Sequence, residues 1–118
     1  MAGYGELLKD DPELATSARE VSARVKDLSS LILEKPMPAG NGFNCTVTYH
    51  DACHLAHAQG ITQQPRSLLR SIPNLMLLEI PEGELCCGSA GTYNMEQPAI
   101  AERLGQRKAA NILRTGAE

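Results

Sequence analysis

The sequence predicts an α/β fold: a partial βαβ unit with parallel strands at residues 43–118, preceded by an N-terminal helical segment at residues 1–38. Residues 43–49 alternate between apolar or aromatic and polar side chains, which is typical of a strand. Residues 75–80 form a short, nearly continuous apolar run, which is typical of a buried parallel strand. A helical pattern follows each strand, and this alternating order predicts a βαβ-type unit.

The N-terminal segment has the pattern of an amphipathic helix. Asp11 followed by Pro12 predicts a helix start, and Ser17 with Glu20 three residues later predicts a second possible start through a capping box. We expect the helix to end at residues 35–42, where two prolines and two glycines predict a loop. The apolar residues between these limits fall on one helical face: Val21, Val25, Leu28, Leu31 and Ile32.

The second segment is built around the two predicted strands. In the first strand Cys45 shares the predicted inward face with Phe43, so we expect it to have a core role. A helix is expected to begin near Pro65 and to end at Pro73. A last helix is expected from Pro98 to Gly116. Lys108 interrupts the apolar stripe of that helix, and we expect its ammonium group to extend to solvent.

The strongest functional signal is the adjacent pair Cys86-Cys87, followed at once by Gly88. Adjacent thiols make a strained disulfide, whereas two soft ligands side by side suit a metal ion or an iron–sulfur cluster. Gly88 permits a sharp turn and removes a side chain that would crowd such a cluster. Cys53 follows the other strand. Ligands gather outside the carboxyl ends of parallel strands, so we expect the three cysteines to converge there.

Composition excludes several classes of partner. The net charge of −3 disfavours nucleic acid and anionic membrane surfaces. The sequence has no apolar run of the roughly 18 residues that a transmembrane helix needs, and its N-terminus does not resemble a signal peptide. Four cysteines without a secretory signal indicate a reducing compartment, so we expect a cytoplasmic location.

Other interpretations of the same residues stay open. The cysteines could be small buried hydrophobic residues, and the histidines could be surface residues or hydrogen-bond donors near a site. His54 and His57 could instead complete a zinc site with the cysteines, although the usual zinc-finger spacing is absent. Asp51 and Glu84 receive no catalytic role, because nothing in the sequence brings them together. The glycine-containing segment 88–91 lacks the pattern of a phosphate-binding loop.

Two segments carry a resemblance to a known family. Residues 49–61 (YHDACHLAHAQGI) and 86–94 (CCGSAGTYN) are similar to the cysteine-rich CCG domain of iron–sulfur oxidoreductase subunits. The similarity points in particular to the second CCG repeat of the iron–sulfur subunits of bacterial glycolate oxidase (glycolate dehydrogenase), which belong to a heterodisulfide-reductase-like family. The family's last cysteine motif would fall beyond Glu118, and its ferredoxin-like cysteine run is absent. We therefore expect the chain to be part of a longer subunit, with residues 43–118 a partial CCG domain.

The resemblance implies an electron-transfer function. It implies an iron–sulfur cluster, of the 4Fe-4S type, bound by Cys53, Cys86 and Cys87 with Gly88 beside them. The electrons would come from an FAD-containing catalytic subunit that oxidises glycolate to glyoxylate, and this chain would supply no catalytic residue. Three thiolates leave an iron without a protein ligand, so we expect the cluster to be incomplete or absent in this chain alone. Partner subunits could hold the protein at the inner face of the cell membrane.

Three further expectations complete the prediction. Related CCG subunits serve lactate, glycerol-3-phosphate or heterodisulfide chemistry, and these remain alternative substrates. A non-redox zinc- or thiol-binding domain is the alternative function. Because a sheet of two strands leaves its edges unpaired, we also expect the chain to form a homo-oligomer through residues 75–80 or through the N-terminal helix.

Overall fold

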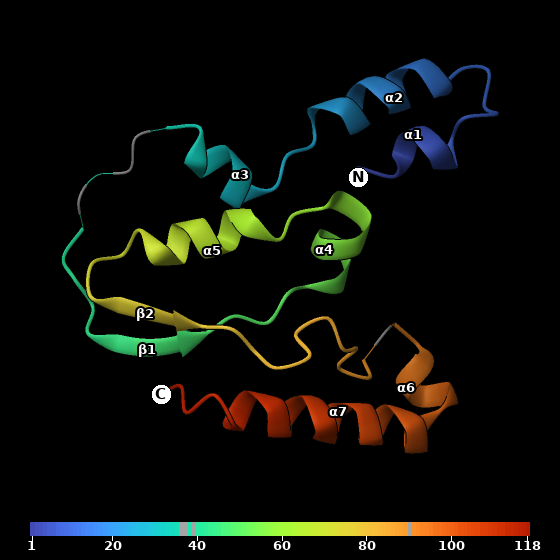
Figure 1. Ribbon diagram of the computed structural model, residues 1–118. Coiled ribbons are helices and arrows are strands. Elements are labelled where there is room, and N and C mark those ends of the chain that lie inside the picture. Colours follow the sequence, from blue (N-terminus) through green and yellow to red (C-terminus); the bar gives the residue numbers. More distant parts are fainter. Residues whose placement is uncertain (36–37, 39, 90) are drawn as a thin grey trace. The chain divides into compact units, whose positions relative to one another are not determined.

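The computed structural model divides the chain into two compact units, Met1–Lys35 and Pro36–Glu118 (Figure 1). It describes residues 1–35, 38, 40–89 and 91–118. The loop predicted at residues 35–42 lies partly outside these described residues. None of the described helices is long and apolar enough to cross a membrane.

The first unit contains three short helices, α1 (Tyr4–Leu7), α2 (Ala15–Arg24) and α3 (Leu28–Leu33). The Asp11 carboxylate accepts hydrogen bonds from the backbone N–H groups of Glu13 (2.9 Å) and Leu14 (2.8 Å) just before α2 begins. The Asp11 signal therefore marks the approach to this helix, whereas Ser17 lies inside it. A start at Ser17 is wrong.

The prediction of one continuous N-terminal helix is also wrong. Val25 is extended, with φ −70° and ψ 120°, and it ends α2. Asp27 then caps a new helix, because its carboxylate accepts a hydrogen bond of 2.9 Å from the Ser29 N–H. An aspartate that bonds the backbone two residues later competes with helix continuation. The predicted apolar stripe is consequently broken, and Val21 and Leu28 are 43% and 66% exposed.

The second unit is the predicted α/β arrangement. Its two strands, β1 (Cys45–Thr48) and β2 (Leu75–Leu78), are parallel and in register, with Cys45 opposite Leu75 and Thr48 opposite Leu78. The crossover between them contains α4 (Cys53–Gln59) and α5 (Gln63–Arg70). The chain continues after β2 into α6 (Tyr93–Glu96) and α7 (Pro98–Leu113) (Figure 1). The predicted βαβ unit is confirmed.

The details of this unit differ from the prediction at both ends of β1. Phe43 lies before the strand and is 62% exposed, so it does not belong to an inward face, and Cys45 is only half-buried. The helix α4 was not predicted. It ends at Gly60, which adopts the left-handed conformation (φ +66°) that favours glycine at a helix terminus.

The core of the second unit is small and partly polar. Its buried apolar side chains come from the crossover, from the residues after β2 and from α7: Ile61, Ile80 and Ala101. The buried polar side chains are Arg66, Lys108 and Asn111. Lys108 is only 3% exposed, so the prediction that it extends to solvent is wrong.

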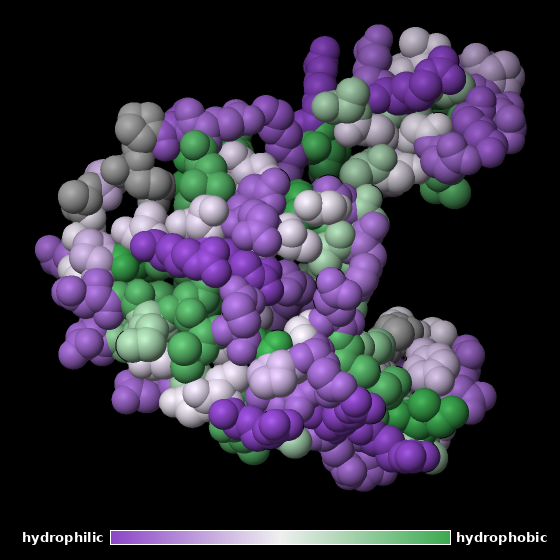
Figure 2. All heavy atoms as spheres, viewed as in Figure 1, coloured by the Kyte–Doolittle hydropathy of each residue, from purple (hydrophilic) through white to green (hydrophobic). Residues whose placement is uncertain are grey.

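The residues after α7 return to the sheet. The backbone N–H of Glu118 donates a hydrogen bond of 2.9 Å to the Thr46 carbonyl of β1. In the described part of the chain, β2 pairs with β1 alone. Figure 2 shows hydrophobic side chains gathered over the two strands on the visible face of this unit.

Candidate functional site

The Cys86-Cys87-Gly88 turn is held by close packing against α7. Gly88 is buried and has φ +86°, a conformation that other residues rarely adopt. A Cβ atom at Gly88 would lie 2.2 Å from the Ala101 carbonyl oxygen, which is a severe overlap. The turn therefore requires glycine, as predicted, but the group that a side chain would crowd in the structure is helix α7.

All the cysteines are free thiols, so none is used in a disulfide. Cys86 and Cys87 are half-buried, and the Cys86 sulfur accepts a hydrogen bond of 3.3 Å from the Gly88 backbone N–H. Cys53 is exposed at the first residue of α4. Soft thiol ligands are therefore present and available on both sequence motifs.

The structure places the two cysteine motifs at different hollows. Cys53 lines a cavity of about 410 Å³, together with His57 and Glu84. Cys87 lines a second hollow of about 340 Å³, together with Asn94. Among the described residues, no three histidine, cysteine or acidic side chains are gathered so that they could hold a metal ion. A common ligand set of Cys53, Cys86 and Cys87 therefore stays a prediction.

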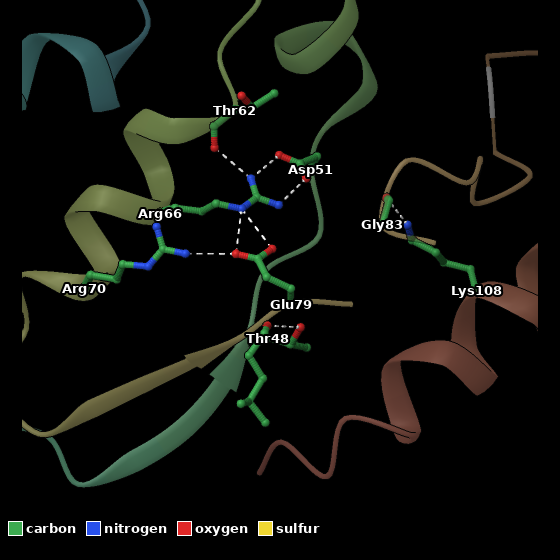
Figure 3. A network of polar contacts seen from close by, with 9 residues as sticks. Thr48, Asp51, Thr62, Arg66, Arg70, Glu79, Gly83 and Lys108 are labelled. Carbon is green, nitrogen blue, oxygen red and sulfur yellow. Dashed lines mark hydrogen bonds and ion pairs between the residues drawn. The ribbon is translucent and has the colours of Figure 1, made fainter. Parts of the chain in front are cut away.

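An arginine at the cavity wall has a role that the sequence analysis missed. Figure 3 shows Arg66 of α5 between the residues that follow the two strands. Its guanidinium group forms a bidentate ion pair with Asp51, at 2.7 and 2.6 Å, and its Nε lies 3.0 Å from a Glu79 oxygen. It also donates to the Thr62 carbonyl at 2.7 Å and lies over the Tyr49 ring, 5.4 Å from its centroid.

This network determines the electrostatics beside Cys53. The hydrogen bonds from Arg66 lower the pKa of Asp51 below its ordinary value, so Asp51 is a structural carboxylate. Burial, with a contribution from nearby Lys108, lowers the pKa of His50 and favours its neutral form. The sequence contained one signal for the network, since both carboxylates follow predicted strands and therefore lie at the same end of a parallel sheet.

The family is decided by a match that covers most of the second unit. Residues 47–118 match the cysteine-rich domain family CCG. The chain belongs to this family. The predicted resemblance to a CCG domain is therefore confirmed, and the matched region includes Cys53 and the Cys86-Cys87 pair.

Several curated proteins are similar to this CCG chain over nearly its whole length. Lactate utilization protein A of Halalkalibacterium halodurans is 34% identical over 98% of this chain and 48% of its own length. An uncharacterized iron-sulfur protein of Methanococcus maripaludis is 35% identical over 99% of this chain and 22% of its own length. A fumarate reductase (CoM/CoB) subunit of Methanothermobacter marburgensis is 40% identical over 94% and 22%.

The chain thus spans about half, or about a fifth, of the length of these relatives. No solved structure matches the chain. None of these three relatives is a glycolate oxidase, so the comparisons support the family and leave the more specific resemblance to glycolate oxidase as a proposal.

Proposed function

We propose that this CCG chain is an electron-transfer module of an oxidoreductase and that its cysteines bind an iron–sulfur cluster. The observation that carries the proposal is the adjacent pair of free thiols, Cys86 and Cys87, in a chain of the CCG family. The printed names of two relatives, an iron-sulfur protein and a fumarate reductase subunit, support the same chemistry.

The donors fit the proposed cofactor by their chemistry. Free thiols become the thiolate ligands of an iron–sulfur cluster, and Cys53, Cys86 and Cys87 would hold a 4Fe-4S cluster. The bound cluster would supply one-electron transfer. The chain contributes a backbone N–H group at the Cys86 sulfur and a half-buried environment for the pair, and both features tune a cluster's reduction potential.

We further propose that the electrons come from an FAD-containing subunit that oxidises a 2-hydroxy acid. Lactate is supported by the names of the lactate utilization relatives. Glycolate is supported by the resemblance of residues 86–94 to glycolate oxidase subunits. Deleting the gene in its native host and comparing growth on lactate with growth on glycolate would separate the two substrates.

Anaerobic reconstitution tests the cluster directly. The chain is incubated with iron, sulfide and dithiothreitol, whose thiols can replace a missing protein ligand. We expect a brown protein with broad visible absorption, and iron and sulfide bound in equal amounts. The variants C86S and C87S should lose most of the bound iron, whereas C45S, which alters the half-buried strand cysteine, should retain it.

Two results would contradict the proposal. A colourless protein that binds zinc tightly through the same cysteines would support the alternative of a zinc-binding domain. Iron uptake that does not change in C86S and C87S would show that the adjacent pair is not part of the site.

A further inference from the structure

One face of α7 contacts the loop that carries the adjacent cysteines. Ala101, Gly105 and Lys108 are spaced so that they lie on the same side of the helix. The Ala101 carbonyl approaches Gly88, and a Cβ atom on Gly105 would lie 3.3 Å from the Cys87 carbonyl oxygen. The small residues at positions 101 and 105 therefore let the cysteine turn rest directly on the helix backbone.

Lys108 binds the same loop from the next turn of the helix. Its side chain is buried, and its ammonium group donates a hydrogen bond to the Gly83 carbonyl, as Figure 3 shows. A buried ammonium group is costly unless it has partners, so its burial here requires the loop to be in place. The pKa of His50 responds to Lys108, which puts the lysine near the carboxyl end of β1 as well.

Two neighbouring side chains of α7 fix the start of the loop. The Glu82 carboxylate accepts hydrogen bonds from Arg107 Nε at 2.9 Å and from Asn111 Nδ2 at 2.8 Å. Glu82 itself has φ +53°, a strained value for a non-glycine residue. Its backbone conformation is therefore maintained by contacts with α7, and residues 82–88 are held at both ends.

We propose that Lys108 and Gly105 of α7 are positioning residues that set the arrangement of the Cys86 and Cys87 thiols. Lys108 acts through its hydrogen bond to Gly83, and Gly105 acts through its close approach to Cys87. This inference rests on the proposed function only in what the thiols would bind. The geometry of the thiols is a property of the chain itself and can be measured without any metal.

The test compares K108M with R103M in the metal-free full chain. Methionine keeps most of the lysine's length and removes the donor and the charge, and Arg103 is an exposed residue on the same helix. The rate of alkylation by iodoacetamide is measured by mass spectrometry for the peptide with Cys86-Cys87 and for the peptide with Cys53. We expect K108M to raise the first rate about threefold and to leave the second unchanged. R103M should change neither.

A second variant keeps the inference testable if K108M does not fold. G105A adds a methyl group against the Cys87 carbonyl, while its helix propensity favours folding by about 1 kcal/mol. We expect an unchanged or higher unfolding midpoint together with about a twofold change in alkylation of the adjacent pair. Equal acceleration at all cysteines in K108M, or unchanged rates in a folded G105A, would overturn the proposal. Failed iron uptake would contradict only the proposed function.

Discussion

Arg66 and Asp51 form a bidentate ion pair in which both guanidinium–carboxylate distances are short: 2.7 Å from Nη1 to Oδ1 and 2.6 Å from Nη2 to Oδ2. The side chains are only 11% and 14% exposed. The pair joins α5 to the segment between β1 and α4, directly beside Cys53. Removing one partner of such a pair leaves the other charge buried and uncompensated.

We therefore predict that R66M destabilises the protein by about 3 kcal/mol. The control is R70M, because Arg70 is half exposed and pairs with the half-exposed Glu79 at 3.0 Å. R70M should cost less than about 1 kcal/mol. Urea unfolding followed by far-ultraviolet circular dichroism measures both. Equal midpoints for the two variants would contradict the structural role of Arg66.

The same pair predicts an acid dependence of stability. Hydrogen bonds from Arg66 lower the folded-state pKa of Asp51 below its ordinary value of 3.8. The ionised pair therefore contributes its full stabilisation above about pH 3.8, and this contribution is lost as the pH falls through the lowered folded-state pKa. D51N should be less stable at neutral pH and should lose less stability on acidification. Urea midpoints at several pH values would show this, and parallel pH curves for wild type and D51N would contradict it.

Gly88 gives a prediction about close packing. G88A places a methyl group on the Ala101 carbonyl in addition to straining a positive φ, so we expect it to cost clearly more than G60A. Gly60 is the matched control, since its φ of +66° is also left-handed but its Cβ position is open. We expect about 1 to 2 kcal/mol for G60A from backbone strain alone. Equal losses of urea stability would show that contact with α7 at Gly88 is unimportant.

Cluster retention gives a prediction about ligand number. Three cysteine thiolates leave at least one iron of a 4Fe-4S cluster without a protein ligand. We expect the reconstituted chain to lose iron when gel filtration removes dithiothreitol and to keep it when the thiol remains. Iron and sulfide analysis before and after filtration measures the loss. A stable cluster without added thiol would mean that another residue of the chain is a ligand.

Self-association is the last prediction. The strands carry exposed apolar side chains, with Met76 of β2 58% exposed, and among the described residues β2 has a strand partner on one side alone. We expect concentration-dependent oligomers in sedimentation velocity over a dilution series. M76K should shift the distribution to monomers. M95K should not, because Met95 is 73% exposed on α6, away from the strands. A monomer at every concentration would contradict the prediction.

Local sequence signals were enough to establish the order of elements in the second unit and the family. Alternation at residues 43–49, the apolar run at 75–80 and proline at the start of the last helix are such signals, and each has a counterpart in β1, β2 and α7. The Cys-Cys-Gly motif is also local, because adjacency and a tight turn are properties of consecutive residues. A family match therefore follows from the same few positions.

Long-range packing settled what these signals could not contain. A periodic apolar pattern cannot show that Val25 is extended, because Asp27 starts a new helix through its own backbone contacts. A single lysine in an apolar stripe cannot show whether its ammonium group reaches water or a carbonyl such as that of Gly83. Arg66, Asp51 and Glu79 meet only when α5 folds over the strand ends, since ion pairing depends on distances between residues far apart in the chain.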